Sequence, residues 1–431
     1  MNRVLRIGLL GCGTVGSGVV ALLQQGADDI AARTGAQLVL TRVAVRDLTR
    51  DRGLMLPDGA LTDDAASVVE ADDVDLVIEV MGGREPAGTL IRRALELGKP
   101  VVTANKELIA SEGPELSAIA QAAGVDLSYE AAVAGAIPII KPLKESLAGD
   151  HVNRVVGILN GTTNYVLTKM TEDGASYEEA LAEAKALGFA EADPTADVGG
   201  HDAASKCAII ASLAFDTAVH GDQVYREGID KVTATDISVA DRLGYVVKLL
   251  AIASEIDDQV AVRVHPAFLP KEHPLAAVRE SFNAVYVEAE AAGELMFYGH
   301  GAGAMPTASA VVGDLIDVTR NLLQTARGPA ESQHRAKPVR PIEDLQTQYF
   351  VLLDVDDQPG VLAEVAQTFG THGVSIAQVW QEGDQDHAQL VLVTHRAREG
   401  DLRATADALA DVAAVRRVAS VMRVESEVFS S

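Results

Sequence analysis

Residues 4–16 read VLRIGLLGCGTVG, an aliphatic run that ends in the pattern G-x-G-x-x-G. This pattern indicates a dinucleotide site only where it lies between a β-strand and an α-helix. The residues that follow, GSGVVALLQQ, have helical periodicity, so the context is met. Gly11 would allow the tight turn, Gly13 the close approach of a pyrophosphate, and Gly16 the packing of helix on strand. A glycine-rich turn without a ligand is the alternative, and the strand–turn–helix order favours the nucleotide.

Short aliphatic runs recur through the first 130 residues and alternate with helical patterns. QLVLTRVAV (37–45), VDLVIEV (74–80) and KPVVTA (99–104) read as strands, and AGTLIRRALELG and ELSAIAQAAG read as helices between them. Aliphatic strands separated by helices predict a parallel sheet covered on both faces. We therefore expect an α/β fold with a Rossmann-type, doubly wound domain over residues 1–130, completed by a helix at about 300–325.

The rest of the chain divides into three further segments. Residues 131–325 mix strands such as HVNRVVGILN (151–160) with long helical stretches, which predicts an α+β domain. Residues 326–344 are rich in proline and polar residues and read as a linker. Residues 345–431 show the order strand, helix, strand, strand, helix, strand, which predicts a ferredoxin-like βαββαβ domain.

Composition excludes several classes of protein. The 431 residues are 48% apolar and carry a formal net charge of -26, which argues against binding to nucleic acid or to anionic membranes. The two cysteines, Cys12 and Cys207, cannot form a disulfide framework, and this favours a cytoplasmic location. The N-terminus lacks the shape of a signal peptide, and no apolar run is long enough to span a bilayer.

The end of the second strand bears on the choice of cofactor. A carboxylate at this place holds the ribose 2′-OH of NAD, whereas an arginine can accept the 2′-phosphate of NADP. The strand is followed by Arg46 and then Asp47. Arg46 is equally explained as a solvated loop charge. The order of the two residues favours NADP, and NAD stays open because Asp47 is adjacent.

Ligands of open α/β sheets gather at the carboxyl ends of the strands. The run KPVVTANKELIA places Thr103, Asn105 and Lys106 at such an end. Lys106 could reach a nicotinamide ribose or a substrate oxygen. In the alternative reading Asn105 caps the next helix and Lys106 lies on the surface.

The stretch GFAEADPTADVGGHDAASK (188–206) gathers carboxylates and ends on a lysine. Asp202 and Lys206 are four residues apart and share one helix face, and Glu191 lies in the loop before them. A carboxylate suits a substrate ammonium group, and a lysine suits a developing alkoxide beside a nicotinamide. The spacing is explained equally well by an ordinary helix ion pair.

Two further segments have sufficient structural explanations on their residues alone. Asn160-Gly161-Thr162 reads as an Asn-Gly turn that caps a helix. Residues 130–137, EAAVAGAI, read as a buried strand-to-loop turn with one carboxylate, Glu130. The histidines are scattered and neither cysteine has a partner at ligand spacing, so zinc finds no support.

Taken together, these motifs make the chain recognisable. Residues 184–206 resemble the signature of homoserine dehydrogenases, and TANKELIA, YEAAVAGAIPII, NGTTNY and YGHGAGAMPTASAVVGDL match that family in order over residues 1 to about 325. The segment DVDDQPGVLAEVAQTF resembles an ACT domain, a small amino-acid-sensing module. The whole chain resembles the long, feedback-regulated form of the enzyme.

The resemblance implies NAD(P)-dependent interconversion of L-homoserine and L-aspartate 4-semialdehyde, a step toward threonine and methionine. It implies catalytic roles for Lys206, the proton donor, and for Asp202 and Lys106, and substrate binding by Glu191 and Asp202. Further roles that it implies fall into three sets: a substrate-side wall from Asn160 and Thr162; cofactor contacts from Thr14, Val15, Arg46, Thr103, Lys106 and Gly303; and a sodium site through Glu130, Val133, Gly135 and Ile137.

For the C-terminal domain the resemblance implies an amino-acid effector site near Asp357, Gly360 and Val361, formed where two such domains pair. It therefore implies a homo-oligomer, a dimer or a tetramer, with threonine as the inhibitor. A Pro-Gly turn alone also explains these residues. Two other functions stay open: another ACT-regulated dehydrogenase, acting for example on 3-phosphoglycerate or prephenate, and a non-catalytic amino-acid sensor in which the nucleotide reports redox state.

Overall fold

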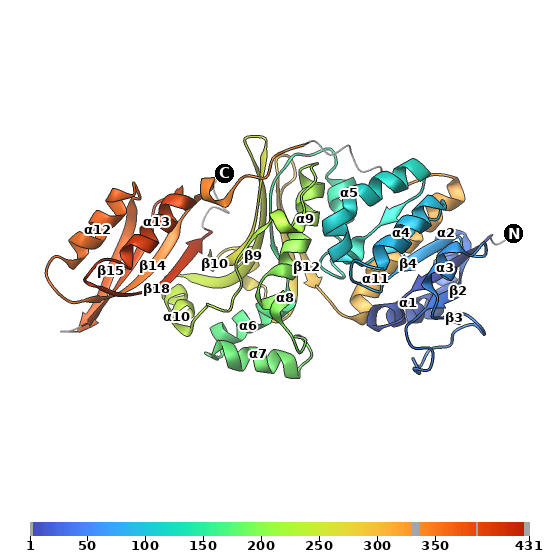
Figure 1. Cartoon of the computed structure of the whole chain (residues 1–431), viewed down its shortest axis with the longest axis horizontal. Coiled ribbons are helices and arrows are strands. Elements are labelled where there is room, and N and C mark those ends of the chain that lie inside the picture. Colours follow the sequence, from blue (N-terminus) through green and yellow to red (C-terminus); the bar gives the residue numbers. More distant parts are fainter. Residues whose placement is uncertain (1–2, 330–335, 385–386, 426–431) are drawn as a thin grey trace.

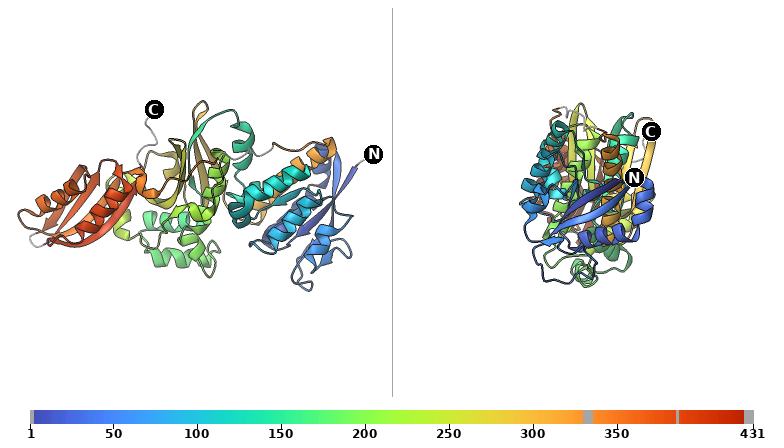
Figure 2. Two further views of the ribbon diagram at one scale, coloured as in Figure 1. Left: turned by 45° about the horizontal axis from the view of Figure 1, so that its top comes forward. Right: turned by 90° about the vertical axis from the view of Figure 1, so that its right-hand side faces the viewer.

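The computed structural model describes residues 3–329, 336–384 and 387–425 and shows an elongated chain of three units (Figure 1). Part of the expected linker, 330–335, and the end of the expected last domain, 426–431, lie outside the described residues. The N-terminal unit and the C-terminal unit occupy opposite ends, and the central unit separates them in both views that show the long axis (Figures 1 and 2).

The N-terminal unit is built on a parallel sheet of six strands in the order β3-β2-β1-β4-β5-β6. This order places β1 at the centre, where the chain crosses from one half of the sheet to the other, and confirms the doubly wound fold expected from the sequence. The strands are β1 (Arg3–Leu10), β2 (Ala36–Ala44), β3 (Leu61–Thr62), β4 (Leu76–Glu79), β5 (Val101–Thr103) and β6 (Leu127–Ser128).

Helices cover this sheet, and one of them comes from much later in the chain. Those of the N-terminal segment are α1 (Thr14–Gln25), α2 (Ala27–Thr34), α3 (Ala65–Glu70), α4 (Ala87–Glu96) and α5 (Lys106–Ala123). The later one, α11 (Ala304–Gln324), packs on α1 so closely that a Cβ on Gly18 would lie 2.8 Å from the Ala304 carbonyl oxygen. Helix α5 begins earlier than the pattern ELSAIAQAAG suggests, because the Asn105 side chain caps it by accepting from Leu108 N.

The central unit is a mostly antiparallel sheet with helices on one side, as expected of an α+β domain. Its strands are β7 (Val152–Ile158), β8 (Tyr225–Arg226), β9 (Tyr245–Ile256), β10 (Gln259–Pro270), β11 (Phe282–Ala289) and β12 (Gly293–His300). Its helices are α6 (Gly161–Glu172), α7 (Tyr177–Ala186), α8 (Thr195–Val198), α9 (His201–Ala214) and α10 (Ala234–Arg242). Short turns of helix are η1 (Glu130–Ala132), η2 (Pro142–Ser146), η3 (Gly221–Gln223) and η4 (Pro274–Ala277).

The C-terminal unit has the order βαββαβ. It comprises β14 (Tyr349–Asp356), α12 (Val361–Thr371), β15 (Ile376–Asp384), β16 (His387–Thr394), α13 (Glu399–Leu409) and β18 (Val415–Val424), with η5 (Ile342–Asp344) and the short pair β13 (Gln346–Thr347) and β17 (Ala397–Arg398). The strand order β18-β14-β16-β15 and the antiparallel pairing confirm the ferredoxin-like arrangement.

The sheets of the central and C-terminal units are continuous. Strand β10 pairs in parallel with β18 through Ala267↔Arg423 and Phe268↔Val424. The rings of Phe268 and Phe350 pack across the junction with centroids 4.7 Å apart. The C-terminal unit is therefore joined to the central unit by main-chain pairing and a shared core. In the described part of the chain, no helix has the length and apolar character needed to cross a membrane.

Candidate active site

The glycine turn lies at the carboxyl end of β1 and fits a bound pyrophosphate. Gly11 adopts φ 96°, and a Cβ on Gly16 would lie 2.2 Å from the Gly11 carbonyl oxygen, so neither position accommodates a side chain. A Cβ on Gly13 would meet nothing within 4 Å, which leaves open space in front of the turn. Helix α1, which starts at Thr14 and Val15, has no side-chain cap and no acidic residue in its first turn. Its N-terminal N–H groups therefore favour an anion.

The charged residues beyond β2 lie beside this turn. Arg46 is exposed. The Asp47 carboxylate accepts from Thr49 N at 2.9 Å and from Thr49 Oγ1 at 2.7 Å, so it is engaged in its own loop. Arg52 Nε donates to the Cys12 carbonyl at 3.3 Å, which brings a second arginine onto the glycine turn. No sequence pattern singled out Arg52, because its position depends on how the loop folds back.

Two other expected cofactor residues line the same edge. Thr103 is fully buried at the end of β5, and its hydroxyl donates to Glu79 Oε2 at 2.6 Å. Only the main chain of Thr103 is therefore left to face a ligand. Gly303 adopts φ 123° and precedes the first residue of α11, beside α1. The turn before α11 and the glycine turn are thus neighbours, although they are far apart in the sequence.

Asp202 and Lys206 lie on the first turns of α9, which starts after Gly200 in the left-handed conformation, φ 78°. Lys206 Nζ lies 2.7 Å from Asp202 Oδ2 and donates to the Leu159 carbonyl at 2.7 Å. Lys206 is only 8% exposed and Asp202 only 6%. Burial lowers the pKa of Lys206, and the nearby cation Lys106 lowers it further, while Asp202 opposes both effects.

Lys106 approaches the same carboxylate from the N-terminal unit. It is the first residue of α5, at the carboxyl end of the parallel sheet, and its Nζ pairs with Asp202 Oδ1. Asn105 does cap the helix, while the half-exposed side chain of Lys106 turns its ammonium group onto the buried Asp202. Burial alone would raise the pKa of Asp202, yet Lys206 and Lys106 outweigh it and hold that pKa well below its usual range. The first and second units therefore meet at Asp202.

Asn160 and Thr162 extend the cluster. Asn160 Nδ2 donates to Asp202 Oδ2 at 2.9 Å and to Asp197 Oδ1 at 2.8 Å. Thr162 Oγ1 donates to Asp197 Oδ2 at 3.1 Å. Asp197 thus belongs to the cluster, although the sequence identified it only as one acid of the loop. Glu191 is exposed in the preceding loop and does not contact Asp202, so its role stays a prediction.

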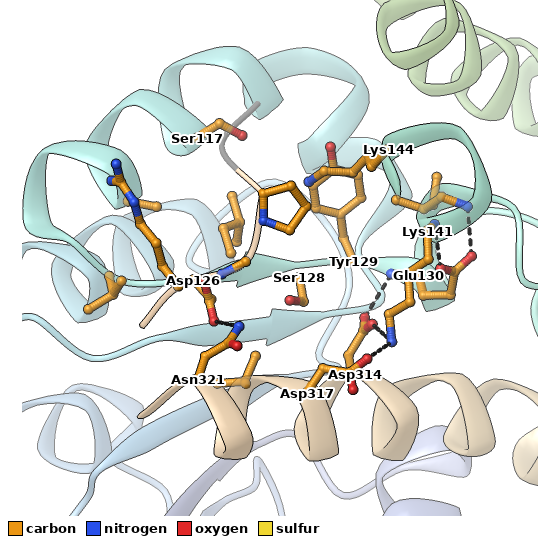
Figure 3. Close-up of a pocket in the computed structure, with 18 of the residues that line it drawn as sticks. Ser117, Asp126, Ser128, Tyr129, Glu130, Lys141, Lys144, Asp314, Asp317 and Asn321 are labelled. Carbon is orange, nitrogen blue, oxygen red and sulfur yellow. Dashed lines mark hydrogen bonds and ion pairs between the residues drawn. The ribbon is translucent and has the colours of Figure 1, made fainter. Parts of the chain in front are cut away.

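The loop expected to hold sodium follows β6, the last strand of the parallel sheet, and begins at Glu130, which Figure 3 labels. The buried Glu130 carboxylate accepts N–H bonds from Ile139 at 2.6 Å, Ile140 at 2.7 Å and Lys141 at 2.9 Å. These bonds leave the carboxylate little capacity for a cation. Among the described residues, no group of three or more His, Cys, Asp or Glu side chains is placed to hold a metal ion. Val133, Gly135 and Ile137 have apolar side chains or none, so each could offer a cation only its main-chain carbonyl group.

A small cavity of about 100 Å³ lies beside this loop and is lined by residues of α5, α11 and η2, which Figure 3 draws as sticks. Asp314 of α11 accepts from Glu130 N at 2.8 Å and pairs with Lys141 Nζ at 3.1 Å. Burial raises the pKa of Asp314 to about 6. These contacts tie α11 to the loop. The cavity is separate from the Lys206 cluster, whose residues do not line it.

The expected effector residues lie together at the turn between β14 and α12. Gly360 adopts φ 99° as the residue before α12, and Val361 is the first residue of that helix. Asp357 is exposed and accepts from Gln381 Nε2 of β15 at 3.1 Å. Their part in effector binding stays a prediction.

Comparisons with known proteins agree along the whole chain. Residues 11–130 match the family model described as homoserine dehydrogenase, NAD binding domain; residues 138–316 match homoserine dehydrogenase; and residues 349–414 match the ACT domain. The homoserine dehydrogenase of Mycobacterium tuberculosis is 54% identical over 98% of this chain and 98% of its own.

Two solved structures extend the comparison. The crystal structure of a homoserine dehydrogenase from Thiobacillus denitrificans matches with a TM-score of 0.93 at 39% identity, over 98% of this chain and 99% of its own. A hyperthermophilic archaeal homoserine dehydrogenase in complex with NADPH matches with a TM-score of 0.62 at 27% identity, over 74% of this chain and 98% of its own. The chain therefore belongs to the homoserine dehydrogenase family of NAD(P)-dependent oxidoreductases and carries a C-terminal ACT domain.

Proposed function

We propose that the cluster of Lys206, Asp202 and Lys106 is the catalytic centre at which L-homoserine and L-aspartate 4-semialdehyde are interconverted. The observation that carries this proposal is that Lys106, from the nucleotide-binding unit, and Lys206, from the central unit, contact the same carboxylate. A substrate bound between these units would contact both the nicotinamide cofactor held by the glycine turn and the buried proton donor Lys206.

The bound nicotinamide would supply the hydride, or accept it in the reverse direction. Lys206 holds the proton at Nζ and gives it to the aldehyde oxygen as negative charge develops there. In homoserine oxidation the neutral amine of Lys206 accepts the hydroxyl proton. Burial of Lys206 favours that neutral form, and Asp202 keeps Nζ in a fixed position.

Substrate recognition falls to the polar groups around Asp202. The amino-acid substrate carries an ammonium group, which a carboxylate can bind in a charge-assisted hydrogen bond. Asp197 and Asp202 are held in place by Asn160, and Asp197 also by Thr162. Glu191 would join them if its exposed loop moved onto the bound substrate.

NADP is the proposed cofactor, with NAD as the alternative. The support is that Arg46 is exposed just after β2, while Oδ1 of the neighbouring Asp47 already accepts two hydrogen bonds from Thr49. The related archaeal structure holds NADPH. Rates with NADPH and NADH at equal concentration test the preference directly, and equal rates contradict it.

A sodium ion is proposed at the loop 130–137, held by main-chain carbonyl groups of Val133, Gly135 and Ile137 and of Glu130. The carboxylate of Glu130 is not proposed as a ligand, since three N–H groups already engage it. Comparing activity in sodium and potassium buffers of equal ionic strength tests this site. Identical rates in the two buffers contradict a requirement for sodium.

The ACT domain is proposed to bind threonine at the turn of Asp357, Gly360 and Val361 and to pair with a second copy, giving a dimer or tetramer. Its edge strand β15 exposes Val379 and Trp380, at 42% and 38%, as an unpaired sheet edge suited to self-association. Asp357→Asn is expected to raise the threonine concentration that halves activity. Unchanged inhibition in this variant contradicts the effector site, and a monomer by light scattering contradicts the pairing.

The proposed domains are those expected from the sequence: 1–130 with 300–325, 131–325, a linker over 326–344, and 345–431. A cytoplasmic location is proposed because Cys12 and Cys207, both in the described part of the chain, are buried free thiols. The whole assignment is tested by following NADPH loss with aspartate 4-semialdehyde and then with other carbonyl compounds. Turnover of a different carbonyl favours another dehydrogenase, and threonine binding without any turnover favours a sensor.

A further inference from the structure

Arg423 of β18 reaches from the ACT domain into the central unit. Its two terminal nitrogens donate to the two oxygens of Glu227, each at 2.9 Å, which is a bidentate ion pair. Its Nε donates to Glu399 of α13 at 3.0 Å, so the guanidinium is also anchored within its own domain. The Arg423 side chain is 6% exposed. We call Arg423 and Glu227 the interdomain clamp.

Tyr225 of β8 supports the clamp from the central unit. Its hydroxyl bonds to Glu227 Oε1 and accepts from Arg403 of α13 at 2.9 Å. Its ring lies 5.4 Å from the guanidinium carbon of Arg423. Burial alone would raise the pKa of Glu227, but Arg423 lowers it to about 2, so the clamp is ionised near neutral pH. Both domains therefore hold the Glu227 carboxylate in one position.

The main chain beyond Glu227 packs on the turn between α8 and α9. Ile229 N donates to the Val198 carbonyl at 2.9 Å. A Cβ on Gly228 would lie 2.3 Å from that same carbonyl oxygen, and a Cβ on Gly200 would lie 3.3 Å from the Glu227 carbonyl oxygen. The two backbone segments are in direct contact, with no flexible side chain between them.

This turn carries the polar centre of the active site. Val198 follows Asp197, and Gly200 is the residue before α9, which presents Asp202 and Lys206. A shift of the turn therefore moves both carboxylates that face the substrate. The path from Arg423 to Asp202 consists of the ion pair with Glu227 and of the tightly packed main chain of Gly228, Ile229 and Gly200.

We propose that Glu227 is a positioning residue: through Arg423 it ties the turn that carries Asp197 and Asp202 to the ACT domain, so that movement of β18 alters affinity for the amino-acid substrate. The inference rests on the proposed function for its kinetic readout. It adds to that function the route by which an effector bound to the ACT domain would influence the active site. Coupling between two sites requires a structural element whose position depends on both of them, and here that element is the turn between α8 and α9.

The variant Glu227→Gln tests the clamp most cleanly. It keeps the size of the side chain and leaves the pair of Arg423 with Glu399 intact. We expect KM for aspartate 4-semialdehyde to rise about tenfold or more, because small displacements of substrate-positioning groups are costly. KM for NADPH should stay at the wild-type value, and threonine should inhibit less. Arg423→Lys, which keeps the charge but loses the bidentate geometry, should show the same split.

Arg417→Gln is the matched control. Arg417 is on the same strand and pairs at 2.8 Å with Asp354 inside the ACT domain, with its side chain 69% exposed. It should leave both KM values and threonine inhibition unchanged. Folded Glu227→Gln protein with wild-type KM and wild-type inhibition overturns the proposal. So does a variant in which both KM values rise equally, since that indicates a general structural role.

Hydrogen exchange separates this inference from the proposed function. Peptides that cover residues 195–206 should exchange faster in Glu227→Gln than in wild type or Arg417→Gln, with no substrate present. Unchanged exchange there overturns the coupling even if the enzyme is active. Wild-type protein that fails to turn over aspartate 4-semialdehyde contradicts the proposed function alone, and the exchange result still decides the coupling.

Discussion

Lys106 of α5 and Lys206 of α9 contact opposite oxygens of one carboxylate, that of Asp202. Two cations and one anion share a site in which Asp202 and Lys206 are almost completely buried. Lys106 disfavours the protonated form of Lys206, while Asp202 favours the protonated form of both lysines. The protonation of Lys206 therefore depends on Lys106, and this dependence can be measured.

Replacing Lys106 by Met is expected to move the pH profile of homoserine oxidation to higher pH. Loss of the cation removes one influence that lowers the pKa of Lys206, so that pKa rises. Oxidation needs neutral Lys206 as the base, and a higher pKa means that less of it is neutral at any given pH. The measurement is kcat against pH in wild type and variant.

Lys169→Met is a suitable control for that experiment, because Lys169 Nζ forms a surface pair with Asp173 at 2.9 Å. Its profile should coincide with that of wild type. A Lys106→Met profile that is unmoved, or moved to lower pH, contradicts the electrostatic coupling of the two lysines.

Gly13→Ala and Gly16→Ala are expected to fail in different ways. A Cβ on Gly16 would lie 2.2 Å from the Gly11 carbonyl oxygen, so Gly16→Ala should lower the melting temperature. A Cβ on Gly13 meets nothing within 4 Å, so Gly13→Ala should melt like wild type yet bind NADPH more weakly. Thermal melts and NADPH fluorescence titrations separate the two effects. Normal NADPH affinity in Gly13→Ala would place the pyrophosphate elsewhere.

Arg46→Ala is expected to raise KM for NADPH by about tenfold or more while leaving KM for NADH nearly unchanged, since a guanidinium recognises the 2′-phosphate that only NADPH carries. Arg52→Ala makes an informative comparison, because Arg52 donates to Cys12 in the glycine turn and should affect both cofactors alike. If Arg52→Ala raises KM for NADPH alone and Arg46→Ala affects both cofactors alike, Arg52 and not Arg46 recognises the 2′-phosphate.

Asp197→Asn is expected to raise KM for the amino-acid substrate by about tenfold to a hundredfold, the usual scale of one lost charge-assisted hydrogen bond. Asp193 provides the control in the same loop, since it is exposed and caps its own turn by accepting from Thr195 N at 3.1 Å. Asp193→Asn should behave as wild type. Equal KM values in the two variants remove Asp197 from substrate binding.

Local sequence patterns predicted much of this molecule. The aliphatic runs at 37–45, 74–80 and 99–104, which alternate with helical patterns, sufficed to predict the parallel sheet, because a doubly wound fold imposes its periodicity over many residues. The four-residue spacing of Asp202 and Lys206 correctly placed both on one face of α9. The βαββαβ order of the C-terminal domain was likewise predicted from the sequence.

Contacts between distant segments were not predictable in this way. The inclusion of Asp197 in the cluster depends on Asn160, which caps α6, and on Thr162 in the first turn of that helix. The engagement of the Glu130 carboxylate by Ile139, Ile140 and Lys141 depends on how a loop curls, and a single sequence carries no signal for it. The parallel pairing of β10 with β18 joins segments of two domains through main-chain groups, which have no sequence signature.

The most direct test of the proposed mechanism is the rate of the Lys206→Met variant with aspartate 4-semialdehyde and NADPH. Because Met keeps the length of the side chain but carries no proton, kcat should fall by about a hundredfold to ten-thousandfold, the range for loss of a general acid. NADPH binding, followed by fluorescence, should stay at the wild-type level. A variant that binds NADPH normally and turns over at the wild-type rate would show that Lys206 is not the proton donor.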